Sequence, residues 1–235
     1  MQHIEIKKVL QMEPQHNTVE VKGWVRSFRS NRFIALNDGS TIKNIQCVID
    51  FEKYEKELLD QITIGAALKV TGILKESQGQ GQAVEIEVSD IEVLGLAPTE
   101  DVKKTILSPK RHSLETLREQ AHLRIRTNAI SSVMRVRAAL SFAIHKYFME
   151  KGFFHMHSPI LTSSDAEGAG EMFQVTTLDL DNLPKTEDGK VDYSKDFFKK
   201  TANLTVSGQL EAETYAMGLG KVYTFGPTFR AENSN

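Results

Sequence analysis

The chain has 235 residues, 40% of them hydrophobic, and a formal net charge of −2, a balance typical of a globular protein with one large domain or two ordinary ones. This charge excludes a general basic field for nucleic acid, so any such site has to be a local patch. The single cysteine, Cys47, excludes an internal disulfide and is typical of a reducing compartment. Because membrane-length apolar runs and the apolar core of a signal peptide are both lacking, we expect a cytoplasmic protein without a membrane partner.

The first part of the chain, residues 1–97, alternates apolar and polar side chains in the way that predicts β-strands. The expected strands lie at 19–25, 32–36, 45–49, 67–75 and 84–94. A short helix is expected at 52–62, between the third and fourth strands, and a hairpin loop at 77–82. Five strands with a helix in this place are the layout of an OB-fold β-barrel.

The rest of the chain predicts a linker and an α+β domain. Residues 98–126 begin with a stretch that has two prolines and no periodicity, which favours a linker or hinge. Residues 127–235 open with a long helix, since apolar side chains recur every three or four positions from Ile130 to Tyr147. Separated strands and a helix at 210–219 follow, and they predict an antiparallel sheet. The polar stretch 178–200 is expected to be a surface insertion.

The most informative pair lies near the end of the sequence. Arg230 and Glu232 are two residues apart on an expected strand from 222 to 232, so both side chains point to the same face. A guanidinium fork beside a carboxylate suits a ligand with phosphate or carboxylate at one end and amino groups at the other. An ion pair across strands is the commoner explanation for such a pair.

Arginines alternate with aromatic rings between Trp24 and Phe33 on the expected barrel. Single-stranded nucleic acid needs cations for its phosphates and flat rings for its bases, so this pattern indicates a binding face. Base stacking and a core position are equally supported for Phe33, whereas a core position is favoured for Trp24. Gln46 could contact a base edge, although most glutamines on strands face water.

Two further patterns are weaker. The loop 164–171 is rich in small residues and could close over a ligand, with Glu167 accepting from an ammonium group, but an ordinary turn explains it as well. His155 and His157 share a strand face without a third ligand nearby, so no metal site is predicted. Glycine-rich phosphate loops and nucleophile elbows are not found.

Taken together, these segments resemble asparaginyl-tRNA synthetases, which are class II aminoacyl-tRNA synthetases of the aspartyl, asparaginyl and lysyl group. The resemblance runs from Val19 to Asn235. Residues 1–97 resemble that group's anticodon-binding OB-fold, 98–126 its hinge, and 127–235 part of its catalytic domain. Residues 124–159 are similar to motif 1, 167–173 to the mobile loop over the amino acid, and 224–235 to the first half of motif 2.

The resemblance implies roles for individual residues. Arg230 would hold the amino-acid carboxylate and the α-phosphate of ATP, and Glu232 would contact the adenine side. Glu167 would bind the substrate's α-amino group, with Gln209 and Ser207 lining the same pocket. On the barrel, Phe33 would stack on the central anticodon base, with Gln46 and Arg26 nearby.

The family also implies partners and cofactors. These are tRNA(Asn), L-asparagine, ATP with Mg²⁺ held by residues of a later motif, and a second copy of the chain bound through motif 1.

The choice of amino acid can be argued from one position. Aspartyl enzymes carry a lysine where this chain has Ala212, and acids stand on either side of it at Glu211 and Glu213. An acidic pocket accepts the N–H donors of an amide and repels a carboxylate. We therefore expect Glu213 to accept the asparagine amide, with Glu211 as the second candidate.

The sequence stops within motif 2, and the family's motif 3 is not part of it. We therefore expect this chain by itself to lack adenylation activity. Two alternatives stay open: a non-catalytic OB-fold protein that binds tRNA or other single-stranded nucleic acid, and an aspartyl or nondiscriminating ligase. The intact catalytic segments favour an asparagine–tRNA ligase, since a pure binding protein has no use for them.

Overall fold

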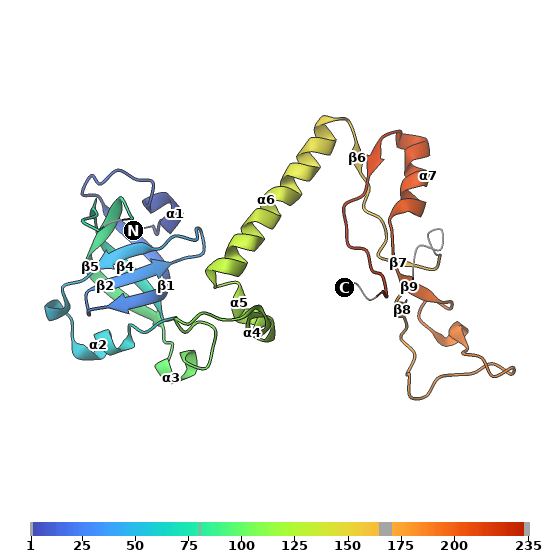
Figure 1. The fold of residues 1–235 in the computed structure, drawn as a ribbon, viewed down its shortest axis with the longest axis horizontal. Helices are drawn as coiled ribbons and strands as arrows, with labels where there is room; N and C mark the ends of the chain where they lie inside the picture. The colour runs from blue at the N-terminus through green and yellow to red at the C-terminus, as the bar shows by residue number, and fades with distance from the viewer. Residues whose placement is uncertain (1, 80, 165–170, 233–235) are drawn as a thin grey trace. The chain divides into compact units, whose positions relative to one another are not determined.

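The computed structural model describes residues 2–79, 81–164 and 171–232. The chain divides into two compact units, Met1–Arg137 and Ala138–Asn235. The long helix α6 (Asn128–Glu150) begins in the first unit and ends in the second (Figure 1).

The first unit is built on a closed barrel with the strand order β1-β2-β3-β5-β4. Its strands are β1 (Thr18–Arg29), β2 (Phe33–Asn37), β3 (Ile45–Val48), β4 (Ala67–Glu76) and β5 (Val84–Gly95) (Figure 1). Neighbouring strands are antiparallel except β3 and β5, which pair in parallel. All five expected strands are present, and the predicted barrel is confirmed.

The barrel interior follows from the alternation in the sequence. Fully buried aliphatic side chains from every strand fill it, among them Val19, Val21, Ile34, Leu36, Ile45, Leu68, Val70, Leu74 and Ile86. Gly72 lets two strands approach closely, because a Cβ there would lie 2.2 Å from the Glu87 carbonyl oxygen. Cys47 is part of this core, and burial raises the pKa of its thiol to about 12, so it is not a nucleophile near neutral pH.

Short helices surround the barrel. They are α1 (Ile6–Val9), η1 (Phe51–Lys53), α2 (Lys56–Gln61), α3 (Thr99–Val102), α4 (Leu114–Glu119) and α5 (Ala121–Arg124). The helix expected at 52–62 is therefore divided into η1 and α2. Helix α1 was not predicted. Its Ile6 and Val9 are part of the core, and its first amide donates to Asp38 Oδ2 at 2.8 Å.

The second unit contains two small sheets. One is antiparallel, with the order β7-β9-β8, and the other pairs β10 with β6 in parallel. The strands are β6 (Phe154–His155), β7 (Leu161–Thr162), β8 (Gln174–Val175), β9 (Ala202–Leu204) and β10 (Val222–Tyr223), and α7 (Gln209–Leu219) follows β9. The strand expected at 222–232 is thus regular over only two residues, and the parallel pairing of β10 with β6 differs from the antiparallel expectation.

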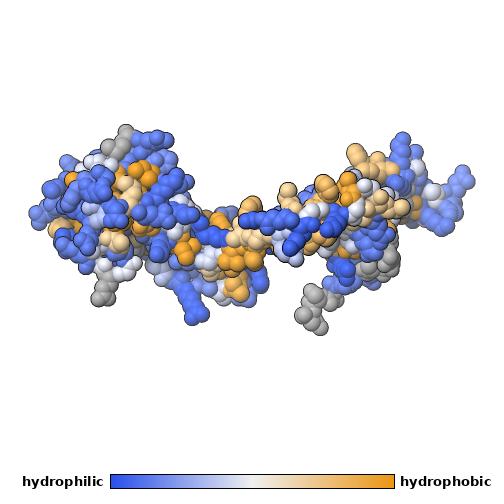
Figure 2. All heavy atoms as spheres, turned by 90° about the horizontal axis from the view of Figure 1, so that it is seen from above, coloured by the Kyte–Doolittle hydropathy of each residue, from blue (hydrophilic) through white to orange (hydrophobic). Residues whose placement is uncertain are grey.

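Helix α6 has the predicted period. None of its residues is buried, and its apolar stripe is open to solvent. The exposed fractions along this stripe are 59% at Val133, 59% at Val136, 58% at Leu140, 36% at Ile144 and 58% at Tyr147. Figure 2 shows apolar side chains at the surface over the span of this helix.

The polar insertion at 178–200 is held by one buried carboxylate, Asp196. It accepts hydrogen bonds from Thr176 Oγ1, from the amide and hydroxyl of Thr177, and from the Phe197 amide, at 2.6 to 2.9 Å. Hydrogen bonding to the charged form, first by Thr176, lowers the pKa of Asp196 well below its usual range. Over the described part of the chain, we find no helix with both the length and the apolar character needed to cross a membrane.

Candidate nucleic-acid face and amino-acid pocket

The outer face of the barrel brings Phe33, Gln46 and Arg29 together. Phe33 lies opposite Arg29 on β1 and opposite Val48 on β3. Phe33 and Val48 alternate with buried core residues, and Arg29 follows the half-buried Phe28. Gln46 and Arg29 line a cavity of about 610 Å³, in which Lys43 supplies a second cation. Gln46 Nε2 donates to Glu85 Oε2 at 3.0 Å, which fixes the amide on this face.

Phe33 is half-buried, with one cation close to its ring. The Arg32 guanidinium lies 5.7 Å from the ring centroid. This geometry gives a base both an aromatic face and a nearby positive charge, which is the combination that stacks single-stranded nucleic acid.

Arg26 does not lie on this face, contrary to expectation. It is the extra residue where the β1–β2 register shifts between Val25 and Ser27, so the alternation that assigns faces breaks at this point. Its guanidinium instead donates to the Arg126 carbonyl oxygen at 2.5 Å and to Asn128 Oδ1 at 3.3 Å. Arg29 lies on this face, opposite Phe33. A bulge is not visible in the pattern of the sequence, so the sequence could not show which arginine shares the face of Phe33.

In the second unit, a turn leads into α7 and carries the predicted amino-acid-binding residues Ser207 and Gln209. Gly208 fits between two side chains, because a Cβ there would lie 2.7 Å from Ser158 Oγ and 3.0 Å from Thr224 Cγ2. Ser207 Oγ accepts from the Gln209 amide at 3.1 Å, which stabilises the first turn of the helix. The predicted pocket residues Ser207 and Gln209 thus lie together on this turn.

Gln209 and Glu213 are coupled across one turn of α7. Gln209 Nε2 donates to Glu213 Oε1 at 2.9 Å, the contact expected for residues four apart on a helix. Glu213 is exposed and Glu211 is half-buried, and neither takes part in an ion pair among the residues that the structure describes. A carboxylate offers about four acceptor positions, so Glu213 keeps capacity for a further donor.

The Arg230 segment lies beside the same turn. The Phe229 amide donates to the Thr205 carbonyl and the Ala231 amide to the Glu171 carbonyl, both at 2.8 Å. The amides of Phe229 and Ala231, two residues apart, are thus both hydrogen-bonded, as in an extended chain, although the segment is not a regular strand. Thr205 links the Arg230 segment to the turn before α7, because its hydroxyl also donates to the Ser207 carbonyl at 2.5 Å.

Arg230 and Glu232 are both exposed, and both follow this extended run. The predicted ligand pair is therefore available to solvent next to the pocket turn. Glu167, the predicted partner of the substrate ammonium group, falls outside the described residues.

Comparison with known families matches this organisation. Residues 113–235 match the model of class II tRNA synthetases (D, K and N), and residues 19–94 match the model of the OB-fold nucleic acid binding domain. The first match covers more than half of the chain. The chain belongs to the class II tRNA synthetases of this group, and the predicted fold class is confirmed.

Within this class, the chain resembles asparagine–tRNA ligases. It is 55% identical to that of Cytophaga hutchinsonii, over 100% of this chain and 51% of the relative, and 55% identical to that of Parabacteroides distasonis, over 98% and 49%. The chain thus spans about half the length of the curated relatives it matches.

A solved structure shares the fold. A crystal structure of asparaginyl-tRNA synthetase from Pyrococcus horikoshii, complexed with asparaginyl-adenylate, has a TM-score of 0.77 at 24% identity and covers 100% of this chain and 49% of that one.

Proposed function

We propose that this protein functions as an asparagine–tRNA ligase, which activates L-asparagine with ATP to asparaginyl-adenylate and transfers it to tRNA(Asn). The observation that carries the proposal is the 55% identity to asparagine–tRNA ligases along the whole chain. The reaction serves translation, so the cytoplasm is its expected location.

The exposed pair after Phe229 provides the contacts for activation. Arg230 binds the carboxylate of asparagine and the α-phosphate of ATP, and it stabilises the negative charge that develops as the carboxylate attacks that phosphate. Glu232 accepts from the amino group of adenine, and Glu167 accepts from the α-ammonium group of the substrate.

Class II synthetases use Mg²⁺ with ATP, where the ion neutralises phosphate charge. Among the described residues there is no group of three or more His, Cys, Asp or Glu side chains that could hold a metal ion. We therefore assign the ion no ligand in this chain.

Selection of asparagine over aspartate rests on Glu213. Its carboxylate is held by Gln209 and has acceptor positions left for the N–H groups of the substrate amide. The aspartate side chain has no donor and carries a like charge, so it is repelled. A site built to hydrogen-bond one substrate can reject its analogue by about 10⁴, once the bound substrate and the closed site exclude water from those partners.

Pyrophosphate exchange with asparagine and with aspartate tests this assignment, on an enzyme that extends this chain to the length of its relatives. We expect strong preference for asparagine in the unchanged enzyme. Glu213→Lys should reduce kcat/KM for asparagine at least about 100-fold, since a cation replaces the acceptor. Glu211→Lys is the matched control on the same helix and should keep most of the preference. Unchanged selectivity in Glu213→Lys would show that the acceptor lies elsewhere.

The barrel provides the tRNA contact. Phe33 stacks on the central anticodon base, Gln46 contacts its edge, and Arg29 binds a neighbouring phosphate in place of Arg26. The shared outer face of these three residues supports the proposal.

We also propose that the protein is a homodimer through motif 1. The support is the apolar stripe of α6, whose residues are each exposed to solvent over 36% to 59% of their surface. A stripe of this width on one helix is typical of a surface that is covered in the assembled protein.

A further inference from the structure

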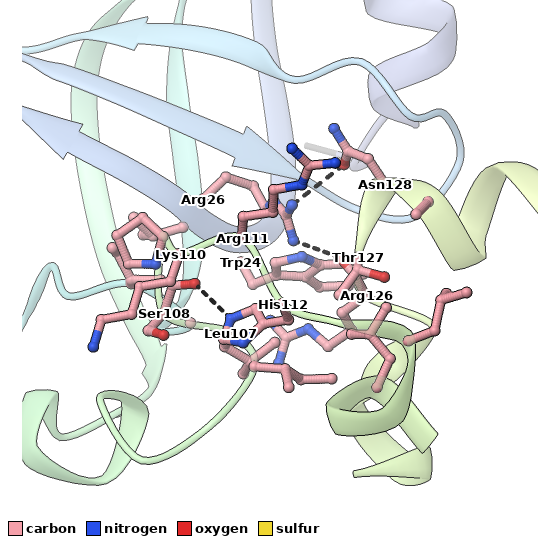
Figure 3. A pocket seen from close by; sticks show the side chains of 18 residues that line it. Trp24, Arg26, Leu107, Ser108, Lys110, Arg111, His112, Arg126, Thr127 and Asn128 are labelled. Atoms are coloured by element: carbon pink, nitrogen blue, oxygen red, sulfur yellow. Dashed lines mark hydrogen bonds between the residues drawn. The ribbon is translucent and has the colours of Figure 1, made fainter. Parts of the chain in front are cut away.

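A second cavity in the first unit has an unusual set of charges. Its volume is about 540 Å³, and it lies between β1, the segment 106–114 and the start of α6 (Figure 3). The charged or titratable side chains that line it are Arg26, Lys110, Arg111, His112 and Arg126, and no acidic residue is among the lining residues. None of these five takes part in an ion pair between residues that the structure describes.

Two polar atoms in the wall are buried without a partner. The Arg126 guanidinium lies over the Trp24 ring, 4.6 Å from its centroid. The Nε of Arg126 and the Nε1 of Trp24 are both buried and have no hydrogen-bond partner among the described residues. Buried donors of this kind destabilise a fold unless they meet an acceptor, so a ligand that brings acceptor oxygens to these two donors would stabilise the site.

The two arginines also repel one another. Burial lowers the pKa of Arg26, and burial followed by the charge of Arg26 lowers the pKa of Arg126. Their one direct contact is the hydrogen bond from Arg26 to the Arg126 carbonyl, which leaves both charges uncompensated. Half-buried like charges without an acid are stabilised by a bound anion.

The chemistry of the lining favours a phosphodiester. Guanidinium groups bind phosphate oxygens through paired hydrogen bonds, and they are the usual contacts to a nucleic-acid backbone. The cavity has the volume of a site for a ligand larger than an ion, and Ile106, Leu107 and Leu114 give it an apolar wall.

We propose that this cavity binds a backbone phosphate of the tRNA, with Arg111 and Arg126 as its main contacts. This inference rests on the proposed function, since the tRNA is proposed to bind the barrel of the same compact unit. It adds a binding point that is separate from the outer face of Phe33 and Gln46, because the two cavities share no lining residue.

The test is the affinity of the chain for a fluorescently labelled tRNA(Asn) transcript, measured by anisotropy over a range of salt concentrations. Arg111→Gln and Arg126→Gln should each weaken binding roughly fivefold at 0.15 M salt and reduce the slope of log K against log salt by about one. Arg118→Gln is the matched control, because Arg118 lies on α4 and does not line the cavity. It should bind like the unchanged chain.

Other outcomes separate the possible failures. Wild-type affinity and slope in both cavity variants, with weaker binding in Phe33→Ala, would overturn this inference and leave the proposed function intact. Failure of the unchanged chain to bind tRNA would overturn both.

If Arg126→Gln loses its circular dichroism spectrum, the exposed Arg111→Gln decides the question. If inorganic phosphate raises the unfolding temperature of the unchanged chain but not of Arg111→Gln, while tRNA binding is the same in both, the site takes a free anion and the inference is wrong.

Discussion

Single residues decide which face of an element carries function. The resemblance placed Phe33, Gln46 and Arg26 near one another, and the structure has Phe33 and Gln46 on neighbouring regular strands of the outer barrel face. Arg26 lies elsewhere, because β1 carries one extra residue at this point and alternation breaks there. The contact between Trp24 and Arg126 could not be predicted either, because it joins residues about one hundred positions apart.

Asp196 is a second case in which a residue acts beyond its own segment. The hydrogen bonds it accepts favour its ionised form, so its pKa is lower in the folded chain than in the unfolded chain. Its stabilising contribution is complete above the unfolded value of about 4 and is lost as the pH falls toward the folded value. We expect thermal unfolding of the second unit to shift to lower temperature between about pH 4 and pH 2.

The variant Asp196→Asn isolates this effect. It should be less stable than the unchanged chain at pH 7 and should lose less stability on acidification. Asp179→Asn is the control in the same insertion, because Asp179 accepts only the Asp181 amide in its turn. Parallel pH profiles of the unchanged chain and Asp196→Asn, in calorimetry, would show that Asp196 does not hold the insertion.

At the scale of elements, helix α6 shows what its sequence pattern does and does not determine. The repeat of apolar residues predicted both the helix and its start near Asn128. Nothing among the described residues covers the apolar stripe of this helix, whose side chains are exposed. The apolar repeat of a helix is a local property of its sequence, whereas the burial of its apolar face depends on which other segments or chains pack against it.

Replacement of one stripe residue tests the proposed dimer. Leu140→Asp places a charge in the middle of the exposed stripe, so it should shift the protein from dimer to monomer in sedimentation velocity. Lys146→Asp is the control, because Lys146 lies outside the stripe and pairs with Glu150. A protein that sediments as a monomer before any substitution would contradict a dimer through α6.

At the scale of the whole molecule, the first unit was more predictable than the second. The barrel strands are long and alternate regularly, and their side chains form one core. The second unit has strands of two or three residues, whose hydrogen bonds depend on partners distant in sequence, such as Thr205 with Phe229. The resemblance grouped Ser207, Gln209, Glu213 and Arg230 in one site, which stays a prediction. In the structure, Thr205 links the segment of Ser207 to the segment that carries Arg230.

Charging of tRNA requires both the barrel face and the amino-acid-binding residues of the second unit, so it tests both parts of the proposed function together. The measurement is the attachment of radiolabelled asparagine or aspartate to a tRNA(Asn) transcript, by an enzyme that extends this chain to the length of its relatives. We predict that asparagine is attached and that aspartate is attached at a negligible rate. Attachment of aspartate at a comparable rate, or of neither amino acid, would contradict the proposed function.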